Sequence, residues 1–296
     1  MMFVTYMISL TTNGTVICLV TFNEHLHQPM YLFIANLATS DLLFDTVTLP
    51  KLIARYLFGA STIPLRMCFF QMFLGHYFGS MDAFLLMLMA ADRYVAICHP
   101  LRYTSIVTNK VVTVSCGICW MILSPSAISM ITILASQIPL CGPNTINSLF
   151  CSYSAHAALA CADISRPRKV VFVTALVILL VPLGLILASY TKIVVAISMT
   201  HAENLQKAFY TCVTHLLVIA LYFTPRIFVY IVTNIPFVTI KPDASALLLY
   251  LYSFVPHMAN PIVYFLRTKE IKQTLRRALQ RNTFREKNGV RTWITC

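Results

Sequence analysis

Long apolar stretches alternate with short polar segments along almost the whole chain. Each stretch is about as long as the roughly 20 mostly apolar residues that a helix needs to cross a bilayer. We therefore predict seven membrane-spanning helices, at about residues 1–22, 30–54, 65–97, 111–134, 167–199, 204–233 and 243–265. There is no internal repeat. The pattern predicts an all-α membrane protein, a seven-transmembrane helix bundle that forms one domain over residues 1–281.

A further, amphipathic helix is predicted after the last apolar stretch, over residues 268–281. Ile271, Leu275 and Leu279 recur every four residues, and basic residues occupy the other faces. A helix of this kind lies flat on a membrane surface. A basic tail with chance periodicity is the alternative. Residues 282–296 are expected to form a tail.

The composition indicates lipid as the solvent. The chain is 58% hydrophobic and only 11% charged, whereas a soluble domain carries about 25% charged residues. Its net charge of +12 does not indicate nucleic-acid binding, because nine of the 22 Lys and Arg residues lie from Arg267 onward. A basic cluster at that place indicates a cytoplasmic flank attracted to anionic membrane lipid.

The distribution of Lys and Arg also predicts an orientation. Fourteen of the 22 fall on the side that holds the carboxyl end, seven fall on the other side, and Arg226 lies within a span. Cytoplasmic loops carry the excess of positive charge. We expect a multi-pass plasma-membrane protein with its N-terminus outside and its C-terminus in the cytoplasm.

Four strings carry a family resemblance. They are Met89–Tyr103 (MAADRYVAICHPLRY), Leu26–Asp41 (LHQPMYLFIANLATSD), Lys207–His215 (KAFYTCVTH) and Pro256–Tyr264 (PHMANPIVY). Together they resemble the odorant receptors, a branch of the rhodopsin-like G-protein-coupled receptors. The resemblance implies a receptor that binds a small odorant in the outer half of the bundle. It also implies activation of a heterotrimeric G protein of the stimulatory olfactory type, which raises cyclic AMP.

Other functions remain open at this point. One is a receptor of the same fold for a non-odorant metabolite. Another is a truncated, non-functional receptor copy, because Met1 starts almost inside the first span and an extracellular amino-terminal segment looks missing or very short. A transporter is disfavoured by the absence of repeated halves and of a glycine-broken helix pair. An enzyme is disfavoured because nothing near His215 and Cys212 completes a catalytic constellation, so no catalytic residues are predicted.

An Asp-Arg pair at the end of the third span is the candidate switch. Arg93 is always charged and can exchange Asp92 for partners on neighbouring helices. A snorkelling interface arginine is the alternative. The proline residues Pro225 and Pro261 can bend the sixth and seventh spans. The resemblance implies that coupling and activation involve Asp92, Arg93, Tyr94, Tyr190, Asn260, Pro261 and Tyr264.

Two carboxyl side chains, Asp41 and Asp82, lie within apolar spans. Buried charge in a bilayer is costly and usually functional. With Asn13 and Asn260 they would line a polar core site. The resemblance implies a sodium ion held by Asp41, Asp82 and Asn260 as an allosteric modulator, and oxygen ligands suit such a hard cation. A protonated carboxyl hydrogen-bonded to neighbouring helices is the alternative. No other cofactor is expected.

Four cysteines, Cys68, Cys141, Cys151 and Cys161, fall on the predicted outer side, where disulfides persist. Four cysteines allow three pairings. The resemblance implies the pairs Cys68–Cys151 and Cys141–Cys161.

The outer halves of the third, fifth, sixth and seventh spans are the predicted ligand pocket, since bundle pockets lie between helices. Arg226 follows Pro225 within the sixth span, where an unpaired guanidinium is costly. It is a candidate receiver for an anionic odorant such as a carboxylate; pairing with an internal acceptor or snorkelling is the alternative. The predicted pocket residues are Gly75, His76, Gly79, Ser80, Thr174, Ile178, Phe223, Arg226, Tyr230 and Tyr250.

Overall fold

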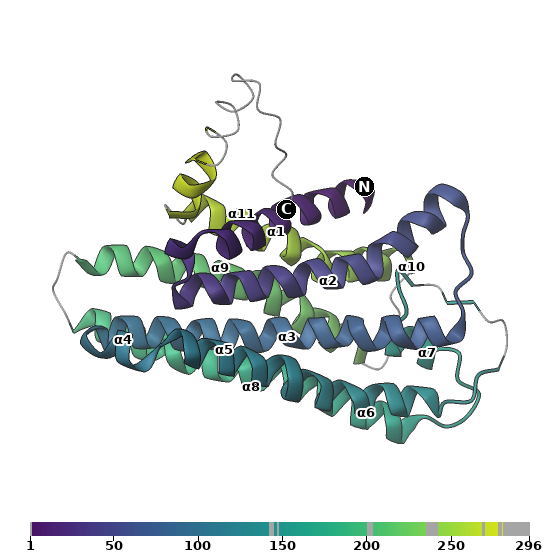
Figure 1. Cartoon of the computed structure of the whole chain (residues 1–296). Helices are drawn as coiled ribbons and strands as arrows, with labels where there is room; N and C mark the ends of the chain where they lie inside the picture. Colours follow the sequence, from purple (N-terminus) through teal and green to yellow (C-terminus); the bar gives the residue numbers. More distant parts are fainter. Residues whose placement is uncertain are drawn as a thin grey trace, which may run out of the picture.

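The computed structural model describes residues 2–141, 145–146, 148–199, 204–234, 242–267, 270–277 and 280. Long helices run side by side along one direction (Figure 1). The long helices are α1 (Met2–Phe22), α2 (Pro29–Phe58), α3 (Leu65–Cys98), α5 (Asn109–Ile118), α6 (Ser124–Ser136), α8 (Ser165–Ser198), α9 (Asn204–Asn234), α10 (Pro242–Ser253) and α11 (Val255–Arg267). Short helices occupy the connections: η1 (Glu24–Leu26), η2 (Pro100–Arg102), α4 (Tyr103–Ile106) and α7 (Tyr153–Ala157).

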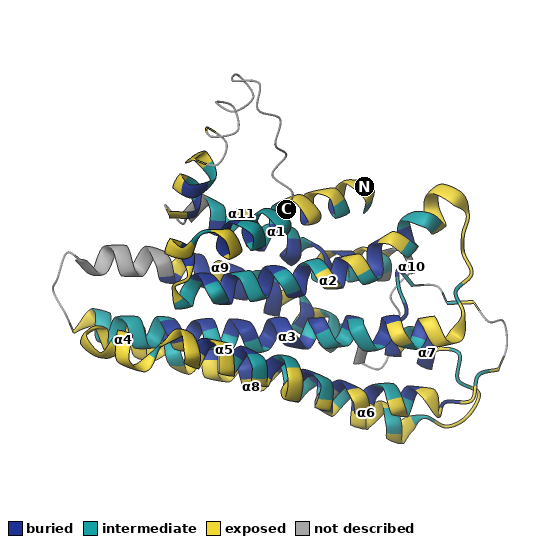
Figure 2. Cartoon of the chain, viewed as in Figure 1, coloured by how far each residue is buried: buried dark blue, intermediate teal, exposed yellow. Residues whose placement is uncertain are grey.

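The bundle has seven helical rods, and α3 is the central one. In the described part of the chain, six stretches are long and apolar enough to cross a membrane; they lie in α1, α2, α5 to α6, α8, α9 and α10 to α11. Helix α3 is the seventh rod. It is buried along most of its length (Figure 2). Because its neighbours shield it from lipid, it can carry polar side chains such as Gln71 and Asp82 without facing the bilayer.

The outward faces of the surrounding helices are apolar. On α8, Val173, Val177, Val181 and Leu185 recur every four residues, and each exposes more than half of its surface. Side chains four residues apart lie on one face of a helix. A soluble protein would bury such a stripe, whereas a membrane protein turns it towards lipid.

Local signals set several helix ends. Helix α2 ends at Gly59, whose φ of 67° is the left-handed conformation that glycine adopts without a steric cost. Helix α5 begins after Thr108, whose hydroxyl accepts a hydrogen bond from the Val111 N–H. Helix α7 begins after Ser152, which accepts from the Ala155 N–H in the same way.

The structure departs from the predicted boundaries at three places. Helix α2 continues to Phe58, beyond the expected end at residue 54. The predicted span 111–134 contains a π-helical turn, η3 (Cys119–Leu123), between α5 and α6. The predicted span 243–265 is interrupted at Phe254, between α10 and α11. The break has a local cause, because Pro256 has no N–H to donate to the carbonyl group four residues earlier.

Part of the predicted amphipathic helix is described. Residues 270–277 are helical, with Ile271 and Thr274 buried and Arg276 and Arg277 exposed. This distribution agrees with one apolar face and one basic face. Leu279 and the predicted tail 282–296 lie outside the described residues.

Candidate ligand-binding and activation sites

Two disulfides lie at one end of the bundle, which we call the disulfide end. One joins Cys68 on α3 to Cys151 and is called the helix–loop disulfide. The other joins Cys141 to Cys161 and is called the loop disulfide. Both are the pairs that the resemblance implied.

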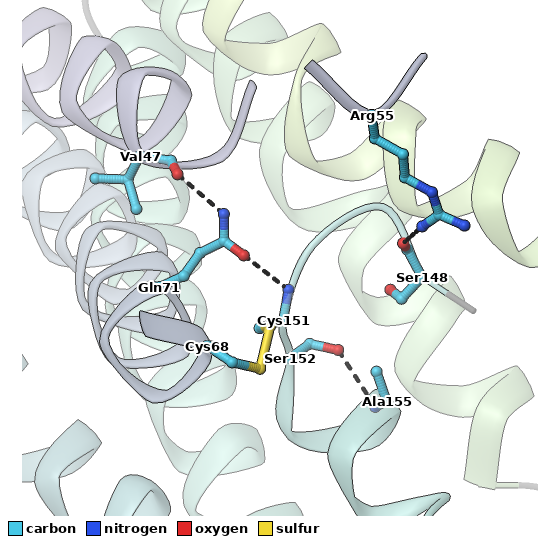
Figure 3. The surroundings of a disulfide bond; sticks show 8 residues. All are labelled: Val47, Arg55, Cys68, Gln71, Ser148, Cys151, Ser152 and Ala155. Carbon is cyan, nitrogen blue, oxygen red and sulfur yellow. Dashed lines mark hydrogen bonds between the residues drawn. A yellow bond between two sulfur atoms is a disulfide. The ribbon is translucent and has the colours of Figure 1, made fainter. Parts of the chain in front are cut away.

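Gln71 reinforces the helix–loop disulfide (Figure 3). Its side-chain oxygen accepts from the Cys151 N–H at 3.0 Å, and its amide donates to the Val47 carbonyl at 3.0 Å. One buried side chain therefore ties α2 and α3 to the loop beside the disulfide.

A cavity of about 100 Å³, which we call the bundle cavity, lies among α3, α6, α8, α9 and α10. Two glycines keep it open on the α3 side. A Cβ atom added at Gly79 would meet nothing within 4 Å, and one at Gly75 would meet only the Phe44 ring, at 3.9 Å. Seven of the ten predicted pocket residues line this cavity: Gly75, His76, Gly79, Ser80, Ile178, Arg226 and Tyr230.

A larger cavity of about 500 Å³, the vestibule, lies beneath the loop at the disulfide end. Lys51 and Arg55 line it, and Phe150 and Cys151 line both cavities. The two cavities therefore share a wall.

Arg226 is the charged group of the bundle cavity. It is buried, and its guanidinium carbon lies 3.6 Å from the centre of the Tyr222 ring. The guanidinium also donates a 3.4 Å hydrogen bond to the Tyr222 carbonyl. Among the described residues no carboxylate forms an ion pair with it. An aromatic face attracts a buried guanidinium without neutralising its charge.

The other three predicted pocket residues lie outside the lining of this cavity. Thr174 is half-buried on α8. The Phe223 ring packs edge-on against Tyr222, with ring centres 4.8 Å apart. The Tyr250 hydroxyl bonds the Thr5 hydroxyl at 2.6 Å. On α9 the lining position belongs to Tyr222, whose hydroxyl donates to the Gly79 carbonyl.

A buried polar cluster lies in the bundle where α2, α3 and α11 meet. Its centre is His257, whose ring nitrogens lie 2.9 Å from Asp45, 3.5 Å from Asp41 and 3.5 Å from Asp82. All four side chains are at most 1% exposed. Asn260 donates to Asp41 at 2.9 Å. The predicted trio Asp41, Asp82 and Asn260 is thus brought together.

His257 and Asp45 were not among the residues predicted for this site. A signal for both was present, because Asp45 follows Asp41 by four residues and His257 precedes Asn260 by three. Residues at these spacings share a helix face. Asn13 joins the cluster from α1, because its side-chain amide donates to the His257 carbonyl at 3.2 Å.

The opposite end of the bundle holds the predicted switch. Arg93 lies 3.4 Å from Asp92, and the Tyr103 hydroxyl donates to the other Asp92 oxygen at 2.7 Å. Burial, followed by this hydrogen bond, raises the pKa of Tyr103 well above its ordinary value. The phenol therefore remains a donor at any physiological pH. The Lys192 ammonium lies 5.6 Å from the centre of the Tyr94 ring.

Two further predicted switch tyrosines have partners on other helices. The Tyr190 hydroxyl bonds the His215 ring at 2.7 Å and so joins α8 to α9. The Tyr264 hydroxyl contacts the Met89 sulfur at 3.9 Å and joins α11 to α3. Pro261 is buried in α11, directly after Asn260. His215, the histidine considered for catalysis, has a structural role in this arrangement.

Comparisons with known proteins agree with this architecture. A family model described as olfactory receptor matches residues 2–282. Olfactory receptor 2AG2 of Homo sapiens is 37% identical over 93% of this chain and 86% of its own length. Olfactory receptor 1E16 of Mus musculus is 36% identical over 93% and 86%, and Olfactory receptor 1M1 of Homo sapiens is 34% identical over 94% and 88%. The similarity therefore runs through every helix of the bundle.

Proposed function

Because this chain belongs to the olfactory receptor family, a family of G-protein-coupled membrane receptors and not of enzymes, we propose that it senses a small odorant carrying a carboxylate. The odorant binds in the bundle cavity, beside Arg226. Binding activates a heterotrimeric G protein of the stimulatory olfactory type and raises cyclic AMP. The disulfide end faces the outside of the plasma membrane, where disulfides persist, and the carboxyl end faces the cytoplasm and its anionic lipid.

The proposal of a carboxylate ligand rests on the surroundings of Arg226. The side chain is 7% exposed and lines the cavity. Its guanidinium lies over the Tyr222 ring, 5.9 Å from the centre of the Tyr252 ring, and bonds the Tyr222 main-chain carbonyl. A planar guanidinium binds a carboxylate through two parallel hydrogen bonds. The bundle cavity holds about 100 Å³, which is less than the roughly 300–1,000 Å³ of pockets for drug-sized ligands. The structure therefore favours a short-chain acid over a large one.

Ligand binding can reach α3 through Tyr222. Arg226 rests on the Tyr222 ring, and the Tyr222 hydroxyl donates to the Gly79 carbonyl of α3. A carboxylate that draws the guanidinium towards itself changes this contact between α9 and α3. Binding then shifts a pre-existing equilibrium towards the active arrangement. In that arrangement Arg93 leaves Asp92, α9 moves outward at its end near Arg93, and the G-protein α-subunit inserts its tail.

The test is a cyclic AMP assay in cells that express the full chain with the olfactory-type G protein. Surface protein is quantified in the same cells. Short-chain acids are compared with their methyl esters, which keep the shape and lose the charge. Arg226→Gln should raise the half-maximal concentration of the acid about 10- to 150-fold, because a hydrogen bond to a charged group contributes about 1.5–3 kcal/mol. Arg226→Lys should lie between Gln and wild type, because an ammonium lacks the planar fork.

The matched control is Arg166→Gln, which removes an exposed charge at the start of α8. It should leave the response to the acid unchanged. An acid response that survives Arg226→Gln at equal surface level would exclude Arg226 as the carboxylate site. A wild-type response to esters and not to acids would exclude the ligand class.

A further inference from the structure

Three ligand atoms converge in the polar cluster without hydrogen-bond partners among the described residues. They are His257 Nε2, Asp41 Oδ1 and Asp82 Oδ2. All lie within 4.8 Å of one another, on side chains that are at most 1% exposed. The 3.5 Å from the imidazole nitrogen to each carboxylate oxygen exceeds the usual 2.7–3.2 Å or so of an N–H···O bond. Buried polar atoms are normally paired. His257 Nε2 lies within ion-pair distance of both carboxylate oxygens, but a single N–H group cannot point at both, so the three atoms fit a shared bound ion.

Two of the three separations between the ligand atoms fit a tetrahedral metal ion. Zinc binds imidazole nitrogen and carboxylate oxygen at about 2.0–2.2 Å, and tetrahedral angles then place neighbouring ligand atoms about 3.3–3.5 Å apart. The separations of His257 Nε2 from Asp41 Oδ1 and from Asp82 Oδ2 are both 3.5 Å. Three protein ligands leave the fourth position for a water molecule.

The remaining atoms of the ligand side chains are already held. His257 Nδ1 bonds Asp45 Oδ1 at 2.9 Å, and this carboxylate in turn accepts from the Ser9 hydroxyl. Metal-binding histidines commonly use their second nitrogen in this way, which fixes the ring orientation.

The second oxygen of each ligand carboxylate is also bonded. Asp41 Oδ2 accepts from Asn260 at 2.9 Å, and Asp82 Oδ1 accepts from Ser40 at 2.7 Å. The free atom of each ligand is therefore the one that faces the common point.

We propose that Asp41, Asp82 and His257 form a binding site for a first-row divalent transition metal ion of the zinc class. The imidazole nitrogen distinguishes this site from the sodium site expected above. Imidazole suits zinc, copper, iron and nickel, whereas an alkali ion prefers oxygen ligands. Asn260 directs its amide N–H group to Asp41.

Charge supports the same assignment. The cluster holds three carboxyl groups and one imidazole, and uncompensated charge in a membrane interior is costly. A divalent ion compensates two negative charges, whereas a proton on His257 compensates one. The ion would join α2, α3 and α11.

The test uses the full chain in lipid nanodiscs, stripped of metal with a chelator. Zinc chloride is titrated in against a constant sodium chloride background, with bound metal measured by mass spectrometry and stability measured by thermal unfolding. The expected result is one zinc ion per chain and a saturable rise in Tm. His257→Asn should weaken zinc binding more than about 100-fold. Asp45→Asn keeps all three ligands and should weaken it about 10- to 100-fold, as loss of an outer-shell partner does.

The matched control is His156→Asn, a buried histidine at the disulfide end whose ring bonds the Ala135 carbonyl. It should keep the zinc response of the wild type. Cobalt provides a test on the unmutated chain, because tetrahedral cobalt(II) gives visible absorption bands that are much more intense, and at longer wavelength, than those of octahedral cobalt(II). Absence of these bands, no zinc response in the wild type, or a zinc response retained in His257→Asn would overturn the proposal. In a separate titration with sodium chloride alone, a Tm rise with sodium and none with zinc would overturn it in favour of an alkali ion.

Discussion

Replacing Tyr103 with phenylalanine removes one hydroxyl group and should raise the basal activity of the receptor. Both oxygens of Asp92 have partners: Tyr103 donates to one at 2.7 Å, and Arg93 lies 3.4 Å from the other. The Asp92 side chain is only 2% exposed and that of Arg93 is 16% exposed. Tyr103 thus helps to fix the carboxylate that holds Arg93. Without the hydroxyl, the Asp92–Arg93 contact loses support in the arrangement that the structure shows.

The size of the effect follows from the Tyr103 hydrogen bond. A bond to a charged group contributes about 1.5–3 kcal/mol, and the half-buried site places it near the lower value. A difference of about 1.4 kcal/mol is a factor of about ten in an equilibrium constant. Minor conformations are populated at about 0.1–10%. An active state at about 1% would therefore rise to about 10%.

The assay is basal cyclic AMP, without odorant, at matched surface level. The control is Tyr77→Phe, which removes a tyrosine hydroxyl bond of similar length, 2.6 Å, to the Trp120 carbonyl. That bond lies away from Asp92. General destabilisation of the receptor would therefore affect both variants, whereas weakening of the Asp92–Arg93 contact would affect only Tyr103→Phe. Basal activity equal to wild type in Tyr103→Phe, or raised equally in Tyr77→Phe, would refute the reasoning.

Three further predictions concern stability and space. Removing the helix–loop disulfide, whose cysteines are 83 residues apart, should lower the free energy of unfolding by about 4.5 kcal/mol. The loop disulfide, with a separation of 20, should contribute about 3.3 kcal/mol; equal Tm losses on thermal denaturation would contradict this order. Burial lowers the pKa of His156 below its ordinary 6.5. The His156 ring therefore binds a proton more tightly in the unfolded chain than in the folded one. The contribution of the neutral His156 ring to stability is complete above pH 6.5 and is lost as the pH falls below that value. When Tm is measured from pH 7.5 to 5.5, it should therefore decline less in His156→Gln than in the wild type. An equal decline of Tm in the two proteins would contradict this prediction. Gly79→Leu should fill the bundle cavity and abolish the odorant response at normal surface level. Gly79→Ala should keep the odorant response, because a Cβ at Gly79 meets no atom within 4 Å. Dose–response curves of the two variants test this difference.

The positions of the helices could be predicted because each span needs a long apolar run, whatever surrounds it. The inward face of each helix was harder to predict. A span that contacts lipid on one side and apolar neighbours on the other shows little periodicity of hydrophobic and polar residues. Phe223 was therefore assigned to the pocket in place of Tyr222, one residue earlier, which the structure places in the cavity wall. One residue turns a helix by about 100°.

Polar residues within spans were more informative, because an apolar surrounding makes each of them costly. Asp41, Asp82 and Asn260 were grouped from sequence, and the structure brings them together. His257 was quoted in the seventh-span string, and its role depends on Asp45, which lies more than 200 positions away. Such a contact depends on how α2 and α11 pack against each other, and this packing cannot be inferred from the order of residues along the chain.

The ligand cavity and the polar cluster share one side chain, Phe44. Its ring lines the bundle cavity and also packs edge-on against His257, with ring centres 4.9 Å apart. A Cβ atom added at Gly75 on α3 would lie 3.9 Å from this ring. Because the cavity holds only about 100 Å³, a ligand that needs more room must displace part of its wall. Movement of Phe44 would alter the packing of His257, and so the proposed metal site that joins α2, α3 and α11. By thermodynamic linkage, odorant and metal would then change each other's affinity by the same factor.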